Sequence, residues 1–319
     1  MTTAPRAPGQ PDWGDLIDAL VEAHGSLATV AERLAAERGH VDHLGSVERA
    51  LRRLRARGGQ PGGQWGARVL RTFGLPLSIE DRLRFMGAYH SRFVDLPVPL
   101  CVDLVGLWDR PPVNEGRTGR LWLGLARLNL AFRGRDLDEA AQILKRLAPL
   151  ATADPAGRVE HLLGGAYVAS YAQPGVLPPH LAEAAQVVAE VAGDDGLNLR
   201  ARIAGQVAWV LNVAGRYAEA EAQMTALPDG PDVPPFARAR RANGLAYVRH
   251  RLGDTDGATA MARRSARYAG DAGHVRLRAM ALLMIARVTS DDAERTEARE
   301  RARAIARALA DPGLLERAG

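Results

Sequence analysis

The sequence contains very little cysteine and lysine and no long apolar run. Its single cysteine, Cys101, excludes an intrachain disulfide framework and a cysteine-based zinc site. Uninterrupted apolar stretches stay well below the ~20 residues that cross a bilayer. The first residues, MTTAPRAPGQPDWGD, lack the apolar core of a signal peptide. These absences favour a cytoplasmic protein without a membrane partner.

Helical periodicity dominates what is present. The 319-residue chain is 47% apolar and 25% charged, as globular proteins are, and its length predicts about two domains. Alanine and leucine recur at helical spacing almost throughout, whereas no segment alternates apolar and polar residues for long enough to indicate a strand. We therefore expect an all-α fold.

Arginine supplies nearly all of the positive charge, because Lys145 is the only lysine and the net charge is +5. Residues 46–75 contain seven arginines and one acid, and residues 236–287 contain eleven arginines and three acids. Between them, residues 128–235 hold eight basic and thirteen acidic residues. A basic patch can steer an anionic partner but does not identify it.

The N-terminal domain is expected at residues 12–76, after a proline-rich tail at 1–11 that we expect to be disordered. Apolar residues at helical spacing predict its first helix from Trp13, with Gly25 ending it. Residues 78–110 then predict two further helices, separated by Pro97 and Pro99, within a helical connector at 77–116 that has no specific motif.

Two more helices are expected in the N-terminal domain. The second is predicted to begin at Thr29, where Thr29 and Glu32 have capping-box spacing, and to end at Gly39. The third is predicted to begin near Ser46, a residue type that favours the N-cap. Its apolar residues form a stripe at i, i+3, i+4 and i+7: Val47, Ala50, Leu51 and Leu54.

These helices resemble the helix-turn-helix DNA-binding class. TVAERLAAERG at 29–39 is similar to a positioning helix, and SVERALRRLRARG at 46–58 to a recognition helix. After the break GGQPGG, residues 64–73 fit either a wing-like hairpin or another helix. The resemblance implies DNA contacts by Ser46, Arg49, Arg52, Arg53, Arg55, Arg68 and Arg71. The alternative is a capping or dimerisation bundle whose arginines only face solvent.

Residues 117–319 repeat themselves. Three similar segments begin 38 residues apart, at Arg200, Arg238 and Arg276. The pattern resembles a long form of the tetratricopeptide (TPR) repeat, a stack of helical hairpins in which small residues allow close helix packing. The matching residues are Leu163, Gly164 and Tyr167 in a first helix, and Gly215 with Ala220 and Gly253 with Ala258 at turns and second helices.

The TPR resemblance implies a groove lined by the first helix of each unit. The implied groove residues are Arg120, Arg158, Arg202, Gln206, Trp209, Asn212, Arg240, Asn243, Tyr247, His250 and Arg278. Guanidinium groups interleaved with aromatic rings suit an extended peptide or protein segment that carries carboxylates. The alternative is structural, with the arginines satisfying helix ends and the aromatic rings packed between repeats.

Enzymatic chemistry is not expected. The sequence has no HExxH or GxSxG motif, no phosphate-binding loop and no cofactor signature. His40 and His43 have no nearby cysteine and do not indicate a metal site, and Cys101 is expected to be a buried small apolar residue.

The leading hypothesis is a transcriptional regulator: a helix-turn-helix-like domain, with or without a wing, binds DNA, and a TPR-like superhelix binds a peptide or protein. The same hypothesis predicts a homodimer. The alternative is a TPR-type scaffold that does not bind DNA. A third hypothesis assigns RNA binding to the basic repeats at 236–287.

Overall fold

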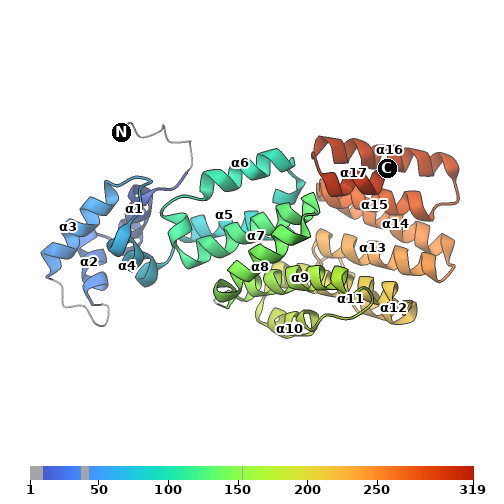
Figure 1. Cartoon of the computed structure of the whole chain (residues 1–319), viewed down its shortest axis with the longest axis horizontal. Helices are drawn as coiled ribbons and strands as arrows, with labels where there is room; N and C mark the ends of the chain where they lie inside the picture. The colour runs from blue at the N-terminus through green and yellow to red at the C-terminus, as the bar shows by residue number, and fades with distance from the viewer. Residues whose placement is uncertain (1–9, 37–42, 153) are drawn as a thin grey trace. The chain divides into compact units, whose positions relative to one another are not determined.

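The computed structural model describes residues 10–36, 43–152 and 154–319, and these residues are all-α, with no strand among them (Figure 1). The predicted tail at 1–11 and the predicted helix end at Gly39 lie largely or wholly outside the described residues. The chain divides into two compact units, one made of residues up to 87 with 102–126, the other of 88–101 with 127–319. The boundaries expected at residues 76 and 116 stay predictions.

The first unit begins with a bundle of amphipathic helices. Their bounds are α1 (Trp13–His24), α2 (Leu27–Ala35), α3 (Leu44–Arg55), α4 (Gly63–Phe73) and α5 (Leu77–Gly87). Trp13, Leu34 and Leu51 are among the fully buried side chains that hold α1, α2 and α3 together. The 3-10 helix η2 (Val113–Glu115) also belongs to this unit, and α6 (Val98–Trp108) and α7 (Arg117–Gly134) contribute residues to both units.

Two predicted helix starts are wrong. Helix α2 begins at Leu27, because the Ser26 hydroxyl is the cap and accepts a hydrogen bond from the Thr29 N–H at 3.1 Å. Helix α3 begins at Leu44 with His43 at the N-cap, so Ser46 lies within the first turn. The predicted end of α1 at Gly25 is confirmed.

The segment at 64–73 is helical. Helix α4 covers it completely, which confirms the helix alternative and excludes the wing-like hairpin.

The second unit is a stack of helices. It continues from α7 through α8 (Leu137–Ala151), α9 (Pro155–Ala172), α10 (Pro179–Val187), α11 (Gly193–Val213), α12 (Tyr217–Thr225), α13 (Pro235–Arg251), α14 (Thr255–Asp271), α15 (Val275–Val288), α16 (Asp292–Ala308) and α17 (Pro312–Ala318). The 3-10 helices η1 (Arg92–Asp95) and η3 (Val188–Glu190) complete the unit.

The packing order is that of a helical repeat. From α8 onward each helix packs against the next, and α9, α11, α13 and α15 also contact one another in that order (Figure 1). Gly215 and Gly253 turn the chain after α11 and α13 with φ of 76° and 88°, a conformation that side chains disfavour. Ala220 and Ala258 are fully buried at the matching places of the second helices.

The end of the second unit packs against its beginning. The Val98 N–H donates to the Leu309 carbonyl at 2.8 Å, and Arg133 on α7 pairs with Asp311 before α17 at 2.9 Å. These contacts join residues far apart in sequence. They bring the segment at 88–96 into the same neighbourhood as α9, α11 and α15.

Candidate binding surfaces

Helix α3 separates apolar and basic residues onto opposite sides. Its apolar stripe is almost fully buried against α1, α2 and α4. The opposite side exposes the arginines Arg49, Arg52, Arg53 and Arg55. The burial therefore fixes the helix, and the guanidinium groups are available at the surface.

Two carboxylates lie on this basic side. Arg52 pairs with Glu48 at 2.8 Å, one helical turn away, and Arg55 pairs with Asp18 of α1 at 2.6 Å. Arg53 has no polar partner among the described residues. Both ion pairs are exposed, and such pairs contribute about 0–1 kcal/mol, so a phosphate can compete for these arginines.

Arg68 and Arg71 on α4 are in different environments. Arg68 is only 5% exposed and donates to the Leu34 carbonyl at 2.7 Å. It therefore ties α4 to the end of α2, and its guanidinium is not on the surface. Arg71 is exposed.

In the second unit, the segment at 88–96 contacts three helices. The Tyr89 N–H donates to Glu160 of α9 at 3.2 Å, and His90 lies 2.8 Å from Asp195 of α11. The Asp95 carboxylate accepts a hydrogen bond from the Arg276 backbone N–H, in the first turn of α15, at 2.7 Å. These contacts hold the Tyr89 side chain among arginines of the repeat.

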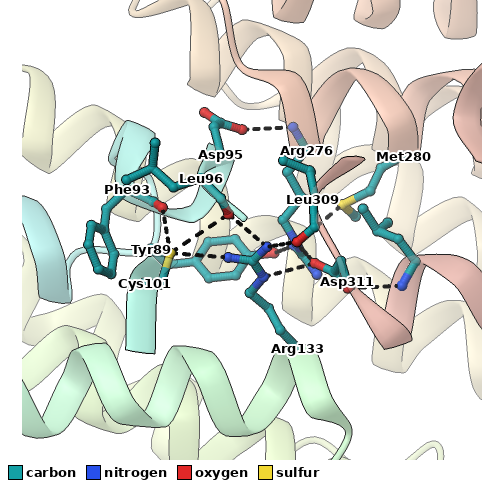
Figure 2. Close-up of polar contacts among 11 residues, drawn as sticks. Tyr89, Phe93, Asp95, Leu96, Cys101, Arg133, Arg276, Met280, Leu309 and Asp311 are labelled. Carbon is teal, nitrogen blue, oxygen red and sulfur yellow. Dashed lines mark hydrogen bonds and ion pairs between the residues drawn. The ribbon is translucent and has the colours of Figure 1, made fainter. Parts of the chain in front are cut away.

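Tyr89 is surrounded by positive charge. The Arg202 guanidinium lies 4.7 Å from the centroid of its ring. Arg276 donates a hydrogen bond to its phenol oxygen at 2.6 Å (Figure 2). Burial acts to raise the pKa of Tyr89, but the charges of Arg276, Arg240, Arg202 and Arg317 outweigh it and hold the pKa below its ordinary value.

Asp311 is the buried counterion of this region. Its Oδ2 accepts from the Nε atoms of Arg133 and Arg276, both at 2.9 Å, as Figure 2 shows. Burial favours the neutral carboxyl, yet the two arginines and the Leu314 N–H hold the pKa of Asp311 below its usual range. Asp311 is therefore structural, since both oxygens of its carboxylate are used within the protein.

Cys101 lies beside this cluster and is fully buried. Its thiol donates to the Phe93 carbonyl at 3.3 Å, and burial raises the pKa of the thiol (Figure 2). The environment of a packed, protonated thiol agrees with the expectation of a small apolar residue.

Arg240 on α13 has no counterion. Arg202 pairs with Glu160, and Arg276 pairs with Asp311, but no hydrogen bond or ion pair joins Arg240 to another described residue. Burial and the neighbouring charges of Arg202, Arg276 and Arg317 lower its pKa, although Tyr89 acts in the opposite direction. An uncompensated charge in such surroundings is costly.

An aromatic row adjoins the arginines. The Trp209 ring of α11 lies 5.6 Å from that of Tyr171 and 6.4 Å from that of Tyr167, and Phe132 lies 4.7 Å from Tyr167. Gln206, one turn before Trp209, makes a long 3.4 Å contact to the Leu163 carbonyl. The Oδ1 atoms of Asn212 and Asn243 are buried without a hydrogen-bond partner among the described residues.

The remaining predicted groove residues are more dispersed. Arg120 is exposed in the first unit, and Arg158 pairs with Glu183 of α10 at 2.5 Å. The Arg287 guanidinium carbon lies 5.7 Å from the centroid of the Tyr247 ring. His250 is half-buried on the last turn of α13. Arg278, aligned in sequence with Arg202 and Arg240, packs beside Gly270 of α14.

The sequence pattern selected only Arg202 and Arg240 and missed most of the cluster around Tyr89. The structure brings Arg276 to Tyr89, two residues before the repeat position at Arg278. Tyr89 lies in a connector without a motif, and Asp311 is 35 residues from Arg276 and 178 from Arg133. Separations of that size leave no periodic signal.

Comparison with protein-family models gives no match, and comparison with curated protein sequences gives none either. Among the described helices none is both long and apolar enough to cross a membrane. In the part of the chain that the structure describes, no three histidine, cysteine or acidic residues gather as they would around a metal ion. His40 lies outside the described residues, and His43 is exposed at the start of α3.

Proposed function

We propose that this protein is a DNA-binding transcriptional regulator with a ligand-binding repeat domain. The helix-turn-helix-like region at 12–76 binds DNA, and the TPR-like repeats at 117–319 bind an acidic peptide or protein segment. The observation that carries the proposal is the exposed basic side of α3, opposite a fully buried apolar stripe. Exposed arginines on a fixed helix suit contacts with phosphates and with guanine edges.

The repeat domain supplies the regulatory half of the proposal. Its stacked helical hairpins, arginines and aromatic row suit an extended ligand with carboxylates. The ligand acts by a population shift: it favours one geometry of a homodimer and thereby one spacing of the two recognition helices.

The test is fluorescence anisotropy of genomic duplex fragments across a salt series. A variant with Arg49, Arg52, Arg53 and Arg55 changed to alanine is compared with the wild type. For every phosphate that the variant no longer binds, the slope of log K against log salt flattens by about 0.9. The matched control changes four exposed arginines of the second unit to alanine: Arg216, Arg251, Arg287 and Arg299.

A flatter slope in the α3 variant alone supports the regulator. No binding by the wild type at low salt contradicts it. An equal loss of DNA affinity in both variants would mean that binding depends on net charge alone. A loss of affinity in the control variant alone would favour binding by the basic repeats.

A scaffold function is the second candidate. The pairs Arg52–Glu48 and Arg55–Asp18 neutralise part of the basic side, as a solvated capping bundle requires. A scaffold would leave the duplex unbound while still binding its ligand through the repeats.

A further inference from the structure

We propose that Arg240 is the central group of a binding site for one oxyanion, a carboxylate or a phosphate, in the helical repeat. This inference rests on the proposed ligand-binding role of the repeat domain and specifies the chemistry that the ligand must have. The site comprises Arg240 with Arg202, Arg276 and Tyr89 beside it.

The charges around Tyr89 are unbalanced. Five arginines act on this region: Arg133, Arg202, Arg240, Arg276 and Arg317. Three buried carboxylates lie here, and none pairs with Arg240: Asp311 pairs with Arg133 and Arg276, and Glu160 with Arg202. Asp95 accepts from the Arg276 backbone N–H and lies 3.5 Å from His274. Tyr89 accepts one hydrogen bond from Arg276. Arg240 is therefore the half-buried guanidinium that the fold leaves without a carboxylate partner among the described residues.

Close packing holds Arg240 in this position. A Cβ at Gly205 of α11 would lie 3.1 Å from Arg240 Nη2, so the guanidinium lies directly against a position that has no side chain. Arg202 precedes Gly205 by one turn on the same helix and stacks on Tyr89. The positive charge of Arg202 acts on Arg240 and helps to lower its pKa.

A ligand can reach the guanidinium. Arg240 is only half-buried. Its guanidinium nitrogens have no hydrogen-bond partner among the described residues, and none of them is fully enclosed by protein. By contrast, the Nε atom of Arg238, two residues earlier on α13, is fully enclosed. Solvent contact at Arg240 allows exchange of a small anion or of an acidic side chain.

The chemistry selects an oxyanion. A guanidinium presents paired N–H donors that match a carboxylate or a phosphate in a bidentate arrangement. A cation would be repelled by the surrounding arginines, and a neutral group would leave the charge of Arg240 uncompensated. Carboxylate and phosphate share this chemistry, and the source is either an acidic peptide or free phosphate.

The experiment is isothermal titration of the full chain with two probes, inorganic phosphate and N-acetylated hexaglutamate, at low chloride. The wild type is compared with Arg240→Met, which keeps the length of the side chain and removes its charge. The control is Arg249→Met on the same helix, where the arginine is one-third exposed and lies 3.6 Å from Glu221.

The wild type and Arg249→Met are expected to bind a probe with equal affinity, and Arg240→Met to bind at least tenfold more weakly. The melting temperature of ligand-free Arg240→Met is expected to equal or exceed that of the wild type, because an uncompensated charge is removed. Arg240→Lys should recover part of the affinity, since it restores charge without the paired donors.

Binding of hexaglutamate alone would identify the source as an acidic peptide, and binding of phosphate alone as free phosphate. Binding of neither probe by the wild type, or equal binding by Arg240→Met, would overturn the inference. A wild type that binds a probe but no duplex would overturn the regulator and leave this site standing.

Discussion

The arginines of α3 and those around Tyr89 have the same side chain in opposite surroundings. On α3 the guanidinium groups are exposed, and two of them meet carboxylates that are themselves at the surface. Around Tyr89 the guanidinium groups are buried or half-buried and share two buried carboxylates. The first set is a solvated basic surface, whereas the second is a coupled network within a packed unit.

This difference in burial predicts which substitutions will change the stability of the protein. Exposed charges are screened by water and salt, so each α3 arginine contributes little to stability and remains available to an external anion. Buried charges depend on one another, because removing one partner leaves another without compensation. The comparison predicts large effects on stability in the second unit and small effects on α3.

The largest effect is expected for Asp311→Asn. The change leaves Arg133 and Arg276 without their shared carboxylate, which should lower the free energy of unfolding by about 3–5 kcal/mol. Urea denaturation monitored by circular dichroism measures it. Asp18→Asn, at the exposed pair with Arg55, is the control and should cost less than about 1 kcal/mol. An equal loss of unfolding free energy in the two variants would contradict the difference proposed between the buried and the exposed ion pairs.

The same carboxylate predicts acid sensitivity. The pKa of Asp311 is lowered in the folded state, so its contribution is fully present above the unfolded-state pKa of about 3.9 and is lost as pH falls through the lower folded-state value. The difference in urea midpoint between wild type and Asp311→Asn should therefore shrink below about pH 4. A difference that stays constant down to pH 3 would contradict this account.

Tyr89→Phe is expected to have an intermediate effect. It removes the oxygen that accepts from Arg276 at 2.6 Å, and a hydrogen bond to a charged group contributes about 1.5–3 kcal/mol. Tyr171→Phe is the matched control, because Tyr171 is exposed and its hydroxyl meets only that of Tyr167. Thermal denaturation of both variants should separate them, and a Tyr89→Phe protein as stable as the control would exclude a role for the phenol.

The smallest effect is expected on α3. Arg52→Ala breaks an exposed pair one turn from Glu48 and should cost about 0.3–0.5 kcal/mol at low salt and less at 1 M salt. Arg53→Ala has no such pair to lose and is its control. Denaturant titrations at both salt concentrations check this, and a loss above about 1 kcal/mol would mean that the α3 arginines are structural.

The helical character and much of the repeat packing could be predicted from the sequence. Apolar spacing identified the buried stripe of α3, and glycines identified the turns after α11 and α13. Helix starts were less predictable, because Ser26 and Thr29 are both good caps and only the geometry of the Ser26 hydroxyl chooses between them. The choice between wing and helix at 64–73 depended likewise on how α4 packs, through Arg68, against α2.

The candidate site was predicted only in part. The repeat pattern selected Arg202 and Arg240, since both recur at the same place in successive first helices. It also selected Arg278, whereas α15 directs Arg276 toward Tyr89 and Asp311. The pattern reports position along a helix, but it does not report which end of the chain will pack against that helix.

The sequence by itself determined the all-α character, the basic side of α3 and the arginines repeated along the second unit, because periodicity and composition are local properties. Only the tertiary structure decided which of those arginines are paired. Tyr89 and Asp311 reach Arg276 across 187 and 35 residues, and their contacts exist only when the end of the unit packs against its beginning. Whether a charge is compensated depends on neighbours in space, and that is why the unpaired state of Arg240 appears only in the folded chain.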